Sequence, residues 1–253
     1  MKPIGIIGGT GLDEPQFISE AEAVTPVTPY GAPSAPILCG RLAGRDVAML
    51  SRHGRQHTIP PPQINNRANL YALKELGCGQ LLATAACGSL RAELGRGHFV
   101  VPDQFIDFTK HRATTFFDVF EPGIQHARHT PMADPFDAEL RAVLVRQGRE
   151  QGMALHDGGT ILTIEGNRFS TRAESNLFRQ WGADLVNMTV APECILANEL
   201  GLAYAVIAVV TDYDCWKTDE PPLRVEDLVA VFHANVEQLG RLLLAVLPAI
   251  QAD

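Results

Sequence analysis

Two acidic side chains end a long apolar segment in the last quarter of the chain. The run 203–211 leads directly into Asp212 and Asp214, with Tyr213 between them. Residues i and i+2 of an extended chain point to the same side, so the two carboxyls can face one ligand together. Their like charges and low solvation are expected to raise the pKa of one of them. The pattern therefore predicts a protonated acid beside a carboxylate acceptor.

This pair of acids suits the departure of a purine base. One carboxyl can donate a proton to N7 as the glycosidic bond breaks, and the other can accept a hydrogen bond from a 6-amino group. Two other interpretations remain open for the segment by itself, a solvated acid pair at the end of a strand and a metal site. The sequence places no cluster of histidines beside the acids as further metal ligands.

A cation and a histidine follow an earlier apolar run, 46–51. Arg52 offers a planar fork of donors and His53 a further donor, as a bound phosphate needs. Such a pair is informative in a chain whose formal net charge is -8. Taken alone, the segment is also explained by a surface ion pair beside a structural histidine, and we assign His57 to that structural class.

A glycine-rich loop follows the first apolar run, in the segment from Gly5 to Gly11. Its glycines allow a sharp turn and a close approach of backbone N–H groups to an anion, and Thr10 adds a hydroxyl. A dinucleotide-binding loop would have a third glycine where Glu14 stands, and no Gly-Lys-Ser/Thr follows for a triphosphate loop. A structural turn and phosphate binding both remain open for this loop.

Further segments end apolar runs with small, aromatic or hydroxyl residues. Ala85 and Ala86 would let a ligand reach their main chain. Thr189 offers a hydroxyl at a predicted helix start, where free N–H groups also favour a phosphate or a sugar. Phe169 and Met188 offer flat or polarisable contacts, although each of them singly is more often part of a core.

The elements that must position these residues alternate between strands and helices. Apolar, β-branched runs predict strands at 4–8, 46–51, 80–86, 98–106, 159–164, 184–189 and 203–211. Apolar positions at three- and four-residue spacing predict helices at 63–77, 137–152, 171–181, 192–200 and 225–249. Pro192 is expected in a first helical turn and Gly201 at a helix end. We therefore expect one α/β domain over residues 1–253, a mixed, largely parallel central sheet flanked by helices, with ligands at strand ends.

The composition limits the classes of partner and the compartment. With 253 residues, 46% of them hydrophobic, the chain can bury one large core. Lys and Arg total 21 against 29 Asp and Glu, which argues against nucleic acid or an acidic membrane as a partner. Five cysteines without a CxxC pair, among them Cys87 with no local base to make it a nucleophile, predict reduced thiols. We recognise no leader and no membrane span, so a cytoplasmic location is expected.

The motifs together resemble the methylthioadenosine phosphorylase branch of the trimeric purine nucleoside phosphorylase family. The resemblance runs from Ile4 to about Ile250. It rests on the stretches GIIGGTGLD, SRHGRQHTIPP, ANLYALKELG, ACGSLR, DQFIDFT, HTPMADPF, TIEGNRF, RAESNLFRQWGADLVNMT and VVTDYDCWK. Agreement of many chemically varied motifs in order is far more specific than any one of them.

The resemblance implies two sets of contacts. The phosphate site would contain Thr10, Arg52, His53, Ala85, Ala86 and Thr189. The family commonly has Thr at the Ala85 position, so this site would rely there on the backbone. The nucleoside site would contain Met188 against the ribose, Phe169 against the base, and Asp212, Tyr213 and Asp214 along the purine edge.

The resemblance also implies specificity positions and an assembly. Ser170, Val225 and Leu228 look like specificity determinants, and apolar walls at the last two would favour a methylthio group over a hydroxyl. His129 is similar to a residue that the family lends to a neighbouring subunit's pocket. A homotrimer with sites between its subunits is therefore expected.

The expected reaction is phosphorolysis of S-methyl-5′-thioadenosine to adenine and 5-methylthioribose 1-phosphate, a step of purine and methionine salvage. Asp212 would act as the acid, inorganic phosphate would be the co-substrate, and no metal or organic cofactor is implied. A methylthioinosine or general 6-oxopurine phosphorylase is the nearest alternative, although that group usually carries Asn at the Asp212 position. A nucleoside-binding protein without turnover and a nicotinamide-binding oxidoreductase are the alternatives from other classes.

Overall fold

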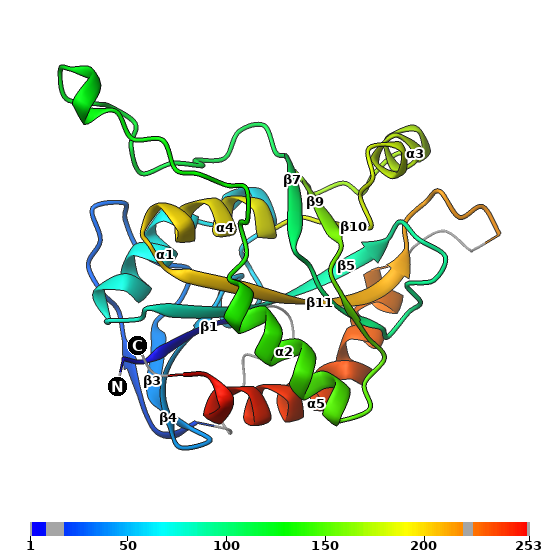
Figure 1. Cartoon of the computed structure of the whole chain (residues 1–253), viewed down its shortest axis with the longest axis horizontal. Coiled ribbons are helices and arrows are strands. Elements are labelled where there is room, and N and C mark those ends of the chain that lie inside the picture. Colours follow the sequence, from blue (N-terminus) through cyan, green and yellow to red (C-terminus); the bar gives the residue numbers. More distant parts are fainter. Residues whose placement is uncertain (1, 9–17, 220–224, 252–253) are drawn as a thin grey trace.

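A central β-sheet runs through the molecule, and helices cover both of its faces (Figure 1). The computed structural model describes residues 2–8, 18–219 and 225–251. Its strands are β1 (Ile4–Gly8), β2 (Ser19–Val24), β3 (Ile37–Leu42), β4 (Arg45–Ser51), β5 (Gln80–Ser89), β6 (Phe99–Val101), β7 (Gln104–Phe108), β8 (Leu155–Asp157), β9 (Thr160–Ile164), β10 (Leu185–Asn187) and β11 (Ala203–Tyr213). Its helices are α1 (Asn66–Glu75), α2 (Ala138–Glu150), α3 (Arg172–Gln180), α4 (Val190–Glu199) and α5 (Val225–Ala249), with short 3-10 turns η2 (Pro61–Gln63) and η3 (Ile124–His126).

The sheet is mixed and largely parallel, as the sequence predicts. Its main path has the order β2-β3-β4-β1-β5-β10-β9-β7, and β11 pairs with both β5 and β6. Six of the ten pairings between described strands are parallel, namely β1 with β4, β1 with β5, β5 with β11, β9 with β10, β6 with β8 and β7 with β9. The direction reverses where β10 meets β5, because that pairing is antiparallel.

A gap along one edge of β5 follows from this topology. Strand β1 pairs with residues 80–83 of β5, and β10, arriving from the opposite direction, pairs with residues 88–89. Strand β11 pairs with β5 along its other edge. Among the described residues, no strand pairs with residues 84–87 on the edge that β1 and β10 share. The carboxyl ends of β1 and β10 therefore point at each other across an unpaired stretch of main chain.

Two apolar layers hold the helices against the sheet. Helices α1 and α4 lie on one face, where Leu70 and Leu196 join a core with residues of β5 and β11. Helices α2 and α5 lie on the other face, where Leu144 and Leu243 join a second core. The apolar stripes of α1 and α2 follow the three- and four-residue spacing from which these helices were predicted, whereas α4 is buried on most of its sides. Within the described residues, no helix is long and apolar enough to cross a membrane.

The structure differs from the predicted elements at several boundaries. The predicted strand 98–106 is two strands, β6 and β7, because Pro102 offers no N–H and the Asp103 carboxylate accepts the Gly159 N–H at 2.9 Å, which turns the chain. The predicted strand 184–189 ends at residue 187, and α4 begins at 190, two residues earlier than predicted; Pro192, its third residue, lies in the first helical turn as expected. Strands β2, β3 and β8 were not predicted. Gly201 ends α4 with φ +64, as expected.

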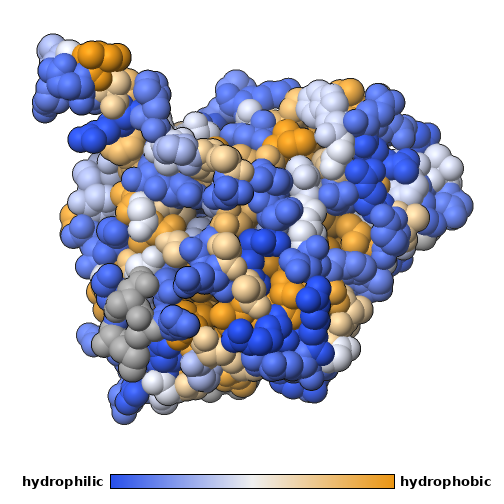
Figure 2. All heavy atoms as spheres, in the orientation of Figure 1, coloured by the Kyte–Doolittle hydropathy of each residue, from blue (hydrophilic) through white to orange (hydrophobic). Residues whose placement is uncertain are grey.

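An irregular segment projects from the body of the molecule. We call residues 111–135 the arm; it contains η3 and is rich in proline over 121–135. Figure 1 shows it reaching well beyond the helices. Val119 and Ile124 of the arm are 87% and 88% exposed. Figure 2 shows hydrophobic residues at the tip of the arm.

Candidate active site

A cavity of about 570 Å³ occupies the gap beside β5. Its volume falls in the usual range for a small-molecule site. It is lined by Arg52, His53, His57, Thr58, Ile59, Pro60, Pro61, Thr84, Ala85, Ala86, Cys87, Gly88, Ile164, Asn167, Phe169, Ser170, Val186, Asn187, Met188, Thr189, Thr211, Asp212 and Asp214. The segments predicted to carry chemistry after β4, β5, β9, β10 and β11 thus meet at one place.

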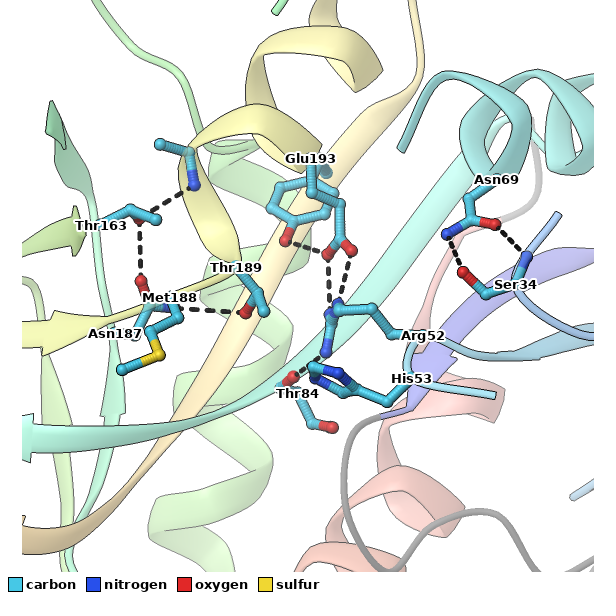
Figure 3. Close-up of polar contacts among 12 residues, drawn as sticks. Ser34, Arg52, His53, Asn69, Thr84, Thr163, Asn187, Met188, Thr189 and Glu193 are labelled. Atoms are coloured by element: carbon cyan, nitrogen blue, oxygen red, sulfur yellow. Dashed lines mark hydrogen bonds and ion pairs between the residues drawn. The ribbon is translucent and has the colours of Figure 1, made fainter. Parts of the chain in front are cut away.

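Arg52 is buried at the cavity wall in a hydrogen-bonded network (Figure 3). Its Nε and Nη2 donate to the two carboxylate oxygens of Glu193 at 2.7 and 2.8 Å, and its Nη1 donates to the Thr84 carbonyl at 3.0 Å. The Tyr204 hydroxyl donates to Glu193 at 2.7 Å. Two of the guanidinium nitrogens of Arg52 therefore bind Glu193, and the side chain also lines the cavity, where its contact with a phosphate stays a prediction.

His53 lies beside Arg52, and its protonation differs from that of the further donor that the sequence predicts. Burial and the neighbouring Arg52 charge lower the pKa of His53 to about 4, so the ring is neutral near pH 7. Its Nδ1 lies 2.8 Å from the Ile59 carbonyl, which can only accept, so Nδ1 carries the proton. Nε2 is therefore an acceptor, suited to a hydroxyl or to the proton of a phosphate.

A chain of hydrogen bonds orients Thr189 at the first turn of α4. The Thr163 hydroxyl accepts the Ala191 N–H at 3.0 Å and donates to Asn187 Oδ1 at 2.8 Å. The Asn187 amide then donates to the Thr189 hydroxyl at 3.5 Å (Figure 3). Because its oxygen accepts from Asn187, the Thr189 O–H is left to donate into the cavity. The hydroxyl predicted for anion binding is thus oriented from β9 and β10.

Ala85 and Ala86 lie in the unpaired stretch of β5, so their main chain faces the cavity as the sequence predicts. Cys87 also lines the cavity, and burial raises the pKa of its thiol above the usual value. The thiol therefore stays protonated, in keeping with our exclusion of a thiolate nucleophile. The other four cysteines are likewise free.

Asp212 and Asp214 both face the cavity at the end of β11. The pairing of β11 with β5 skips one residue between Val210 and Asp212, and this bulge turns the strand end toward the site. Burial raises the pKa of Asp212 to about 6; the Asp214 charge adds to the rise, and the Thr211 hydroxyl, donating at 2.7 Å, opposes it. The pKa of Asp212 is therefore raised as expected, and burial contributes more to this rise than the like charge of Asp214 does.

Asp214 differs from Asp212 in its surroundings. Burial raises its pKa too, and the nearby hydroxyls of Ser175 and Ser170 and the Cys215 N–H offset part of the rise. Three buried oxygens, Asp214 Oδ2, Ser170 Oγ and Ser175 Oγ, have no hydrogen-bond partner among the described residues. Asp214 and Ser170 therefore present unused hydrogen-bonding capacity to a ligand.

Tyr213 is not among the residues that line the cavity, so its predicted contact with the substrate stays a prediction. Alternation along the strand sends its ring to the other side from Asp212 and Asp214, where its hydroxyl donates to the Ala92 carbonyl at 3.1 Å. Phe169 and Met188 do line the cavity. The ring of Phe169 is 40% exposed, as an open wall of a binding site would be.

Four predicted residues cannot be placed in the cavity. Thr10 lies outside the described residues, although β1 leads to it and Gly8, the last residue of β1, accepts the Arg52 N–H at 3.0 Å. Val225 and Leu228 belong to α5, but their side chains lie outside the described part of the structure. His129 is exposed on the arm, where its ring packs on Phe120 at 5.8 Å between centroids.

Sequence reasoning missed residues that support the site from behind. Glu193, Tyr204 and Thr163 make no motif by themselves, and His57, assigned to a structural role, lines the cavity. A usable signal existed for Glu193, because it is an acid in the first turn of an otherwise apolar buried helix. The pairing of that acid with Arg52 depends on a sequence separation of 141 residues, which no local pattern reveals.

Comparison with known proteins gives consistent results. The model of the phosphorylase superfamily matches residues 3–248. An S-methyl-5′-thioadenosine phosphorylase from Danio rerio is 48% identical over 247 residues, which is 98% of this chain and 88% of the relative. Methylthioadenosine phosphorylase from Schistosoma mansoni in complex with adenine superposes with a TM-score of 0.92 at 39% identity, covering 100% of this chain and 93% of that chain. A variant of the Schistosoma mansoni adenosine/methylthioadenosine phosphorylase in complex with methylthioadenosine gives a TM-score of 0.90 at 38% identity, covering 100% and 93% of the two chains.

Proposed function

The chain belongs to the phosphorylase superfamily, and we propose that it catalyses the phosphorolysis of S-methyl-5′-thioadenosine to adenine and 5-methylthioribose 1-phosphate. It is an enzyme of the pentosyltransferase class. The observation that carries the substrate assignment is the pair Asp212 and Asp214 beside Gly88 of β5, in the same cavity in which Arg52 binds the carbonyl of Thr84, four residues earlier on that strand, and is followed by His53. Thr189 also lines this cavity. We call the two acids, with Phe169 and Ser170, the base half of the cavity, and Arg52, His53 and Thr189, with Ala85 and Ala86, the anion half.

The division of the cavity matches the bonds that change. The C1′–N9 bond breaks with its electron pair moving to the purine, while a phosphate oxygen forms a bond to C1′. Asp212, whose pKa is raised to about 6, donates a proton to N7, and Asp214 accepts from the 6-amino group. Neutral His53 can accept a hydrogen bond from the phosphate proton, which is lost when the phosphate becomes an ester. Asp212 thus gives one proton to the purine and regains one from water, and the proton that the phosphate loses passes to water.

The anion half holds phosphate by dipoles more than by charge. Its groups are the Thr189 hydroxyl, the open main chain at Ala85 and Ala86, and the edge of an Arg52 that is already paired. Such preoriented donors suit a transient anion, because they stabilise a nucleophile in position without a large net charge to hold the product.

The base half explains the preference for a 6-amino purine. Asp214 Oδ2 is buried and makes no hydrogen bond of good geometry among the described residues, so an amino group would satisfy its hydrogen-bonding capacity. A 6-oxo purine would place a carbonyl acceptor against this carboxylate. We therefore do not favour the 6-oxopurine alternative, and the relatives named above act on the methylthioadenosine class.

The assembly, the location and the absence of a cofactor are part of the proposal. We expect a homotrimer in which the exposed arm carries His129 to the pocket of a neighbouring subunit, where it would help Val225 and Leu228 to enclose the 5′ substituent. The apolar tip of the arm, with Val119 and Ile124 exposed, supports such a contact. The reaction balances without a metal or an organic cofactor, so activity should survive exhaustive treatment with EDTA. A cytoplasmic role in purine and methionine salvage accords with this substrate.

The test is a substrate panel measured with and without inorganic phosphate. Methylthioadenosine, adenosine and methylthioinosine are each incubated with the enzyme, and free base is measured by chromatography. We expect phosphate-dependent release of adenine, fastest from methylthioadenosine. Release of base without phosphate would instead indicate a hydrolase, faster turnover of methylthioinosine would overturn the 6-amino assignment, and binding without release would indicate a nucleoside-binding protein.

A further inference from the structure

Arg112 is a buried cation at the root of the arm, outside the residues that the sequence singled out. Its side chain is only 3% exposed. A buried guanidinium requires several acceptors, because an unpaired charge in the interior is strongly unfavourable. Its acceptors identify what it holds in place.

The acceptors of Arg112 are mainly carbonyl groups at the ends of two adjacent strands. Its Nη1 donates to the Met188 carbonyl at 2.5 Å, directly after β10. Its Nη2 donates to the Glu165 carbonyl, directly after β9, and approaches the Ile164 carbonyl at 3.4 Å. The Glu165 carboxylate provides a weaker contact, with Oε1 at 3.4 Å from Nε. One planar group therefore bridges the main chain after β9 and after β10.

Both bridged segments form the walls of the cavity. Met188 lines it directly, and the segment after Glu165 continues through Asn167 and Phe169 to Ser170, all of which line it as well. The wall expected to face the ribose and the wall expected to face the base are thus held at a fixed separation by Arg112. Strands β9 and β10 pair only over residues 161–163 and 185–187, so the bridge continues the alignment beyond the last strand pairing.

The same contacts anchor the arm. The other carboxylate oxygen of Glu165 accepts the Lys110 N–H at 2.5 Å, immediately before the arm. The Glu199 carboxylate at the end of α4 accepts the Thr115 hydroxyl at 2.8 Å and the Phe116 N–H at 2.7 Å. Past these bonds the chain leaves the body toward the exposed tip (Figure 1). Arg112 lies within this anchored segment, so one side chain joins the arm to both walls.

We propose that Arg112 is a positioning residue that sets the separation of the ribose and base walls and couples that separation to the seating of the arm. Only the expected change in KM depends on the proposed function; the bridge between the two walls does not. The shape of the guanidinium is essential, because its two Nη groups reach two carbonyls in one plane, whereas a lysine ammonium offers one nitrogen. Charge alone would not produce the bridge.

The decisive variant is Arg112→Lys, which keeps the charge near His53 and removes the bridge. We expect the KM for methylthioadenosine to rise about tenfold, as for loss of a charge-assisted hydrogen bond, with the KM for phosphate changed less than about twofold. Arg67→Lys is the matched control. Arg67 also holds the arm, at Asp118 and the Thr115 carbonyl, but it touches neither wall. It should leave both KM values close to those of the wild type.

A second measurement does not depend on activity. Amide hydrogen exchange of the ligand-free protein should become faster in segments 165–170 and 188–190 of Arg112→Lys, and remain as in the wild type in β1 and α2. Should this variant fail to fold, Arg112→Gln, with one donor group and no charge, is measured in the same way. Unchanged exchange in both wall segments, or equal rises in the two KM values, would overturn the proposal. Faster exchange in an enzyme without phosphate-dependent activity would support the bridge and reject the proposed function instead.

Discussion

The anion half and the base half of the cavity are built on opposite plans. In the anion half, polar groups already bond one another: Arg52 with Glu193, Glu193 with Tyr204, and Thr189 with Asn187. In the base half, Asp214 Oδ2 and Ser170 Oγ are buried without partners among the described residues. One half is oriented before any ligand arrives, and the other keeps hydrogen-bonding capacity that only a ligand can use. Discrimination between purines therefore belongs to the base half, and alignment of the nucleophile belongs to the anion half.

The largest effect expected from breaking this division is that of Asp212→Asn. An amide of the same shape cannot donate a proton to N7, so kcat should fall by about 10²–10⁴, the usual contribution of general acid catalysis. The KM for phosphate should change little, because the anion half is untouched. Steady-state rates of adenine release at saturating phosphate measure the loss.

Tyr213→Phe is the control for that substitution. Tyr213 stands between the two acids in the sequence, but its ring points away from the cavity. It should retain the wild-type kcat. Undiminished turnover in Asp212→Asn would remove Asp212 from its role as the acid and leave the base half with recognition alone.

The next largest effect concerns the preoriented network of the anion half. Glu193→Gln leaves Arg52 buried without a full counter-charge, which should cost about 3–5 kcal/mol of unfolding free energy. Phosphate bound in the cavity supplies negative charge near the same guanidinium, so it should raise the Tm of this variant more than that of the wild type, whereas a nucleoside should not. Thermal unfolding with each ligand measures the difference.

Tyr204→Phe provides the comparison, since it removes one donor to Glu193 and keeps the charge. Its loss should be about 1–3 kcal/mol, with the wild-type response to phosphate. An equal phosphate response in Glu193→Gln and in the wild type would show that Arg52 does not reach the anion at all.

The same contrast explains what the sequence reveals. Asp212, Asp214 and Thr189 are visible because polar residues at the ends of apolar runs have no packing role there. The strands and helices carry their own periodic signal, so the mixed sheet and its main elements were predictable, apart from strands without an apolar run, such as the polar, exposed β2. The sequence thus indicates two kinds of residue: polar residues that face a ligand, and apolar residues that recur at the spacing of a strand or a helix.

Groups satisfied by distant partners leave no such signal. Arg52 was recognised, but its grip on Glu193 spans 141 positions, and the reversal of β10 against β5 that opens the cavity is a property of the whole sheet. The tautomer of His53 likewise depends on the Ile59 carbonyl, a contact made by the turn after β4. Many residues of the site can therefore be found from the sequence, but the orientation of their side chains can be found only from the folded structure.

A third and smaller effect is the dependence of kcat/KM on pH. It distinguishes the two halves, because Asp212 in the base half and His53 in the anion half have different pKa values. The pKa of Asp212 is near 6, so its acid form declines above that pH and kcat/KM for the nucleoside should fall, approaching tenfold per pH unit. The pKa of His53, lowered to about 4, gives no limb between pH 5 and 8. Rates corrected for the ionisation of phosphate itself measure the profile.

Stability should follow the same carboxyl. Because the folded pKa of Asp212 lies above its ordinary value of 3.8, its contribution is full below pH 3.8 and is lost as the pH rises through about 6. Asp212→Asn should lack this part of the pH dependence of Tm. If the Tm of the wild type fell only below pH 5, the pH dependence of stability would have to come from a group other than Asp212.

The smallest effect tests how closely Gly166 is packed against Met188, in the wall expected to face the ribose. Gly166 has φ +74, and a Cβ there would lie 2.8 Å from Met188 Sδ, so Gly166→Ala must displace the thioether. Gly182→Ala isolates that contact, because Gly182 has φ +88 with no atom within 4 Å of a Cβ. Both should lose about 1 kcal/mol of stability from the left-handed backbone. Only Gly166→Ala should also raise the KM for methylthioadenosine, by about two- to fivefold, since a flexible thioether yields at a cost below about 1 kcal/mol. Equal KM values in the two variants would mean that Met188 does not shape the nucleoside site, and that the wall after β10 serves the anion alone.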